Sequence, residues 1–151
     1  MIGTGLVPAG LAAILCLAAL ASDTAPVRRC GAIAFAVAAG HGLVGLFTPA
    51  RQAYAGFNPV LAAIDLFGLV LLTGVALKAD RHFPLAMAAT ALVATLTHLL
   101  RSVSLFTDPL GYLALVQGSC YAMVAMLVVG ALASHGKALP GRSPGANEAE
   151  P

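Results

Sequence analysis

The chain has 151 residues, of which 60% are hydrophobic and only 9% are charged, and its mean hydropathy is +0.92. Soluble domains carry about 25% charged residues, so this composition excludes an ordinary soluble globular protein and indicates a membrane protein. The net charge of +2 is too small and too scattered for nucleic-acid binding, which needs a basic stripe on one face.

Five apolar segments follow one another along the chain, and each has roughly the 18 to 22 residues needed to cross about 30 Å of hydrocarbon at 1.5 Å per residue. The connections are short and rich in Pro, Gly, Asp and basic residues, which end helices and lie among lipid headgroups. The predicted fold is an all-α polytopic membrane protein, a single bundle over residues 1–133. The predicted spans are about 4–21, 30–48, 60–77, 85–106 and 113–133.

The first segment has two interpretations, because residues 19–22 (ALAS) also fit the cleavage site of a signal peptide. The preceding MIGTG carries no Lys or Arg, however, and a cleaved signal would translocate six of the eight basic residues. That outcome violates the positive-inside rule. We therefore expect an uncleaved first helix, an N-terminus outside and a C-terminus inside, in the bacterial inner (plasma) membrane. Residues 134–151 then form a flexible cytoplasmic tail, because they are rich in Pro, Gly and charge.

The three cysteines suggest neither a disulfide framework nor a zinc site. Cys16, Cys30 and Cys120 are an odd number without CxxC spacing, and two of them lie inside apolar runs, so we expect small buried hydrophobic side chains. The HExxH motif and the P-loop are absent. Neither an enzymatic activity nor a metal site is therefore indicated by these motifs, and whether the protein is an enzyme stays uncertain.

In the expected orientation, four spans place ionisable or amide side chains in the outer leaflet. Counting along the helices puts His98 about 12 Å and Arg101 about 7.5 Å below the outer membrane surface, and Asp65 also about 7.5 Å below it. An isolated charge near a span centre costs about 2.5 to 3.5 kcal/mol, and less toward the ends. We therefore predict an ion pair between Asp65 and Arg101. The whole expected cluster is His41, Asp65, His98, Arg101 and Gln117.

Helical phase, at about 100° per residue, predicts which faces carry these side chains toward protein. The fourth span has a face of small and polar residues: Ala91, Ala94, Thr95, His98, Arg101 and Ser102. The second span has a stripe of mostly small residues that lets helix backbones approach closely: Ala34, Ala38, His41, Gly42 and Gly45. Gly68 shares a side with Asp65, and Gln117 is aligned with Tyr121 and Val124. Three aromatic residues are expected at headgroup level on the outer side: Tyr54, Phe57 and Tyr112.

Residues 58–133 carry a resemblance to a known group. The segments AAIDLFGLVLL, ALKADRHFPL, THLLR and DPLGY, and the final span with Tyr121, resemble a pattern in small uncharacterised inner-membrane proteins of sphingomonad-type alphaproteobacteria. The chain departs from that pattern in having no Trp after the ADR loop. The resemblance implies a topology and no activity.

Three functions are compatible with the cluster. It could fix helix register in a structural or accessory protein that contacts the lipid bilayer and other membrane subunits. His41 and His98 could instead ligate a b-type haem, with Arg101 near a propionate; covalent attachment is excluded because CxxCH is absent. Finally, Asp65 and the two histidines could serve proton-linked transport or small-ligand sensing, although the inner half of the spans offers no comparable groups.

Overall fold

The computed structural model describes residues 14–22, 24–48, 56–79, 82–105 and 108–135, and every regular element in this part of the chain is a helix. The four long helices are α2 (Ala25–Phe47), α4 (Pro59–Ala76), α5 (His82–Ser102) and α6 (Pro109–His135). Residues 14–20 form a further short helical stretch. The rest of the first predicted span, and the tail from residue 136 onward, lie outside the described residues.

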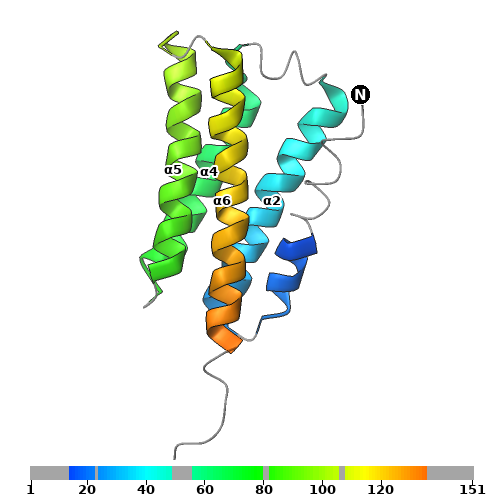
Figure 1. The fold of residues 1–151 in the computed structure, drawn as a ribbon, viewed down its shortest axis with the longest axis vertical. Helices are drawn as coiled ribbons and strands as arrows, with labels where there is room; N and C mark the ends of the chain where they lie inside the picture. The colour runs from blue at the N-terminus through cyan, green and yellow to red at the C-terminus, as the bar shows by residue number, and fades with distance from the viewer. Residues whose placement is uncertain (1–13, 23, 49–55, 80–81, 106–107, 136–151) are drawn as a thin grey trace, which may run out of the picture.

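The four long helices form an antiparallel bundle in which each one runs opposite to the next (Figure 1). The principal packing pairs are α2 with α4, α4 with α5, α5 with α6, and α6 with α2, so the bundle closes into a ring. As a result, the last part of α2, the first part of α4, the last part of α5 and the first part of α6 share one end of the bundle. We call it the network end, and we call the opposite half the apolar half.

All four helices are long and apolar enough to cross a membrane. Their large hydrophobic side chains are exposed on every helix, among them Phe47, Phe67, Leu99 and Leu132. Such outward-facing apolar surface is expected of helices whose solvent is lipid. The predicted fold class, an all-α multi-span membrane protein, is confirmed to this extent.

Short polar residues fix where two helices begin at the network end. The side chain of Asn58 accepts hydrogen bonds from the backbone N–H groups of Val60 and Leu61 at 3.1 and 3.3 Å, directly before Pro59. Asp108 accepts from the N–H groups of the residues two and three positions later, at 3.2 and 2.8 Å. These N-caps satisfy amide groups that the first helical turn leaves without partners.

Helix α5 ends at Ser102, earlier than the predicted boundary at 106. Ser104 has φ of 58°, a left-handed conformation. The N–H of Ser104 bonds to the carbonyl of Arg101, and the N–H of Leu105 bonds to that of Leu100. This is the hydrogen-bond pattern of a Schellman C-cap, so the helix stops although the apolar sequence continues.

The apolar half contains the main hydrophobic cluster of the described bundle. The cluster draws on the early residues of α2 and α5, the late residues of α4 and α6, and the stretch 14–20. Its members are Cys16, Ala19, Val27, Cys30, Ala34, Leu72, Met87, Ala88, Ala91, Met123 and Leu127. Two of the three cysteines are thus fully buried, and the third, Cys120, is partly buried.

One glycine lets α2 and α4 approach closely beside the polar end of the interior. A Cβ on Gly68 would lie 2.6 Å from Cγ2 of Val37, closer than real Cβ atoms come to a neighbour. Gly68 is buried on the same side of α4 as Asp65, as the helical phase predicts. The absence of a side chain at residue 68 therefore brings the α2 backbone near the carboxylate one turn away.

Candidate functional site: a buried polar network

Asp65 is the centre of the candidate site. It lies on the buried face of α4, and its side chain is only 4% exposed. The Oδ1 atom of Asp65 lies 2.9 Å from Nε2 of His41, on α2. The Oδ2 atom lies 2.9 Å from Nε2 of His98, on α5. A single carboxylate therefore bridges two imidazoles from two other helices.

Helix α6 contributes the fourth member, Tyr112. Its hydroxyl lies 2.7 Å from Nδ1 of His98, and the two rings meet edge to face with their centroids 5.5 Å apart. Tyr112 is fully buried, and the side chain of His98 is 1% exposed. We call His41, Asp65, His98 and Tyr112 the polar network. Each residue of the network comes from a different helix.

The protons in the network can be assigned from the hydrogen bonds. A carboxylate only accepts, so both Nε2 atoms donate to Asp65. A neutral His98 that donates from Nε2 must accept at Nδ1, so the Tyr112 hydroxyl donates to it. No buried side-chain nitrogen or oxygen atom among the described residues lacks a partner. The network therefore avoids the cost of leaving polar groups unpaired in a low-dielectric interior.

The ion pair predicted between Asp65 and Arg101 is wrong. Both carboxylate oxygens of Asp65 bond to histidines. The guanidinium carbon of Arg101 instead lies 5.5 Å from the ring centroid of Tyr112, within the range of a cation–π interaction. Counting residues along the helices had placed Arg101 and Asp65 at the same depth in the membrane. It did not show that each carboxylate oxygen of Asp65 bonds to a histidine.

The structure brings three of the five predicted cluster residues into direct contact, since His41, Asp65 and His98 are joined. Gln117 is placed elsewhere: its Nε2 donates at 3.3 Å to the hydroxyl of Tyr121 on its own helix. Tyr121 is 45% exposed, so this face of α6 does not point into the bundle.

Tyr112 was missed, because a tyrosine close to a helix start was expected at headgroup level. Its full burial overturns that expectation. A signal was present in the sequence: Tyr112 opens a series at helical spacing whose members are all buried. The series is Tyr112, Val116, Ser119, Met123 and Leu127.

The predicted face of α5 is largely confirmed, since Ala91, Ala94 and His98 are buried. The stripe on α2 is confirmed only in part. Ala34 is buried and His41 contacts Asp65, but Gly42 and Gly45 are exposed, and a Cβ at either would meet nothing within 4 Å. Within the described part of the chain, no neighbouring helix therefore packs closely on these two glycines.

Ligation of a haem iron by both His41 and His98 would require hydrogen bonds of the polar network to break. Both ring nitrogens of His98 and the Nε2 atom of His41 are engaged in hydrogen bonds. An axial ligand to iron needs a free nitrogen lone pair.

The sequence GHGLVG at residues 40–45 has the GxGxxG spacing of dinucleotide-binding loops. In those loops the glycines form a turn between a strand and a helix, so that the helix N-terminus faces a pyrophosphate. Here all six residues lie inside α2, close to its C-terminal end. The spacing therefore has no phosphate-binding context.

Comparison with known proteins adds no further information about the site. No protein-family model, no curated protein and no solved structure matches the chain at a significant level.

Proposed function

We propose that the chain is a small integral membrane protein with a structural or accessory role, and that the polar network fixes the relative positions of its four long helices. The observation that carries this proposal is the unbroken series of hydrogen bonds from His41 through Asp65 and His98 to Tyr112, with one residue from each helix. Interhelical hydrogen bonds of this kind hold membrane bundles together without a hydrophobic driving force.

The test is the stability of the bundle in mild detergent. Asp65→Ala leaves two histidines without their shared acceptor, and it should lower the free energy of unfolding by about 1 to 3 kcal/mol, given roughly 0.6 to 1.7 kcal/mol per intramembrane hydrogen bond. The matched control is Gln117→Ala, because Gln117 lies outside the network. Equal stability of both variants and the wild type would contradict the proposal.

A double-mutant cycle identifies the partner of Asp65. The combined loss for Asp65→Ala and His98→Ala should be clearly smaller than the sum of the single losses, because both changes remove the same hydrogen bond. The corresponding cycle with Arg101→Ala should show weaker coupling, because both carboxylate oxygens of Asp65 pair with histidines and Arg101 lies over the ring of Tyr112. Strict additivity for Asp65 and His98 would show that their contact does not support the bundle.

The accessory role, with other membrane subunits as partners beside the lipid bilayer, is supported by the short connections between the long helices. It is tested by the mass of the particle that contains the chain in native membranes. A particle heavier than the isolated protein supports it, and an equal mass contradicts it. The proposed setting is a bacterial inner membrane, with the network end outside, in keeping with the resemblance over residues 58–133.

The haem alternative is tested by absorption spectra of the purified protein, oxidised and then reduced with dithionite, after expression with haem supplied. The hydrogen bonds of His98 lead us to expect no Soret band. A Soret band that disappears in His41→Ala would overturn this expectation and establish a b-type haem protein.

Proton-linked transport through the bundle is the less favoured alternative. Transport needs titratable or hydrated groups along the whole path. The polar network occupies one end, and the buried polar side chains described outside it, Ser22, Thr97 and Ser119, are hydroxyl groups without a titratable proton in the physiological range. A network of hydrogen bonds that connects the helices is therefore better supported than a proton pathway through the bundle.

A further inference from the structure

The helical stretch 14–20 packs closely on the first half of α2 at a glycine. A Cβ on Gly31 would lie 2.9 Å from Cβ of Ala19 and 3.3 Å from the carbonyl oxygen of Cys16. All three of these residues are buried. In Figure 1 the stretch is the short dark-blue helix beside the lower part of α2. The absence of a side chain at residue 31 therefore lets this stretch approach the α2 backbone.

The same side of α2 continues toward the network end as a surface of small residues. At about 100° per residue, Ala38, Gly42 and Gly45 lie within about 40° of Gly31 around the helix axis. Gly42 and Gly45 are exposed, and a Cβ on either would meet nothing within 4 Å among the described residues. His41, which contacts α4, lies about 80° away from Gly31. We call Ala38, Gly42 and Gly45 the open face of α2, because the described helices supply no close neighbour for its glycines.

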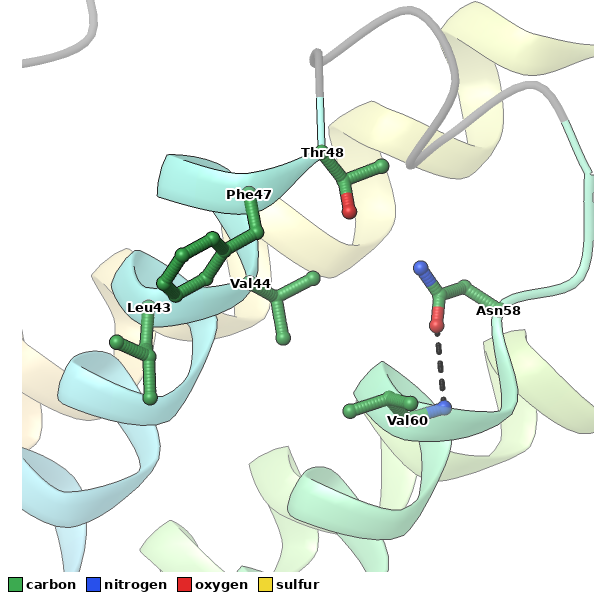
Figure 2. A pocket seen from close by; sticks show the side chains of 6 residues that line it. All are labelled: Leu43, Val44, Phe47, Thr48, Asn58 and Val60. Carbon is green, nitrogen blue, oxygen red and sulfur yellow. Dashed lines mark hydrogen bonds between the residues drawn. The ribbon is translucent and has the colours of Figure 1, made fainter.

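An open groove at the same end of the bundle is a separate feature. It has a volume of about 360 Å³ and lies between the end of α2 and the start of α4. Figure 2 shows the side chains that line it: Leu43, Val44, Phe47, Thr48, Asn58 and Val60. Neither Gly42 nor Gly45 is among them. A molecule that filled this groove would therefore leave the open face uncovered.

The sequence before residue 14 carries a stripe of small residues that matches the open face. Within the stretch 14–20, Cys16 and Ala19 are buried, whereas Ile14 and Leu17 are 63% and 49% exposed, so the first pair marks the side turned toward α2. Steps of three and four residues toward the N-terminus continue this side with small residues: Ala12, Ala9 and Gly5. Two such stripes allow two helix backbones to approach closely.

We propose that residues 4–13 continue the helical stretch 14–20 and cover the open face of α2. Two observations select this segment as the occupant. The open face is continuous with the part of α2 that the stretch 14–20 already covers, and the segment joins that stretch directly in the chain. Ten helical residues rise about 15 Å, which is enough to reach the level of Gly42. Pro8 lies near the start of this helix, where the N–H groups have no helical partner.

The contact at Gly31 sets the register of the proposed interface. Gly31 lies between Cys16 and Ala19 of the antiparallel stretch. Two antiparallel helices have the same rise per residue, so each step along α2 is matched by one step toward the N-terminus of its partner. One heptad beyond Gly31, Ala38 should therefore face Ala9. This inference is independent of the polar network, and it makes the first segment a permanent helix of the bundle instead of a signal that is removed.

The experiment is disulfide cross-linking of the full chain in membranes, with the three native cysteines replaced by alanine. Ala9→Cys combined with Ala38→Cys should form a disulfide within one chain on mild oxidation, since facing small residues bring the two Cα atoms within about 7 Å. Leu11→Cys combined with Ala38→Cys is the matched control. Residue 11 has nearly the same level but should point away from α2, so this pair should lose most of the cross-linking.

Fragment masses of the oxidised protein identify the joined residues and the first residue of the chain. Equal cross-linking of the two pairs would overturn the inference, because the segment would then have no preferred side toward α2. A disulfide-linked species of twice the mass would also overturn it, since a second copy would then cover the open face. So would a chain from which the segment before residue 14 has been removed.

A second measurement changes the volume of a side chain on the open face. If the face is bare, Gly42→Leu meets no neighbour within 4 Å and should melt like the wild type. A covering helix makes the same change an overpacked contact, and we expect the melting temperature in mild detergent to fall by roughly 3 to 9 °C. Gly74→Leu on α4 is the control, since a Cβ there also meets nothing among the described residues. Equal melting temperatures of the two variants would overturn the inference.

Discussion

At the scale of single residues, the hydroxyl of Tyr112 offers a selective test of the network. Tyr112→Phe keeps the ring that packs beside His98 and removes the hydroxyl that bonds to Nδ1. The variant should lose about 0.5 to 1.5 kcal/mol of unfolding free energy, the cost of one intramembrane hydrogen bond. The loss of free energy is measured by unfolding each protein in mild detergent. Tyr121→Phe is the control, because that side chain is exposed and its hydroxyl bonds only to Gln117 among the described residues. Equal losses for the two variants would contradict the assignment.

The sequence identified most of the network residues but not their pairing. The cost of a lone charge in lipid correctly indicated that Asp65 needs a partner, and the helical phase placed His98 on the protein-facing side of α5. The estimated depths could not show whether Arg101 or the histidines pair with Asp65. The pairing depends on how each helix is rotated about its axis and on how far each side chain extends. The burial of Tyr112 was missed because one aromatic near a helix start does not reveal which face it occupies.

At the scale of helices, the contact of α2 with α4 depends on Gly68. A Cβ at this position would lie 2.6 Å from Val37. Gly68→Ala should therefore push the helices apart next to Asp65 and lower the unfolding free energy by about 1 to 3 kcal/mol, as overpacking does. Gly74→Ala on the same helix is the control, since a Cβ there meets nothing within 4 Å. Detergent unfolding compares the two, and a Gly68→Ala protein as stable as Gly74→Ala would refute the close approach.

The positions of the helices were the most predictable part of the fold, because long apolar runs between polar turns leave little choice in a membrane. The ends were less predictable. The N-caps Asn58 and Asp108 set the starts of α4 and α6 near the beginning of their apolar segments. The C-cap at Ser104, in contrast, ends α5 while the apolar segment still continues. The glycines of α2 show a further limit, since a small-residue stripe indicates a packing face but not what packs on it.

At the scale of the whole molecule, the two ends of the bundle differ in charge as well as in their interior. Arg28, Arg29 and Lys78 belong to the end formed by the start of α2 and the end of α4. The network end has Asp108 and Arg101 among its described residues. Positive charge in short connections is retained on the cytoplasmic side of a membrane. This asymmetry favours an orientation in which the apolar half lies toward the cytoplasm and the polar network lies in the outer leaflet.

That orientation predicts which connections a membrane-impermeant thiol reagent reaches in intact cells. In a variant with the three native cysteines replaced by alanine, Gly56→Cys lies between α2 and α4, and Ala79→Cys lies between α4 and α5. Gly56→Cys should react in intact cells, whereas Ala79→Cys should react only after the membrane is permeabilised. The reverse pattern would place the polar network, and the exposed side of His41, toward the cytoplasm. Reaction of both in intact cells would mean that α4 does not cross the membrane, because its two ends would then share one side.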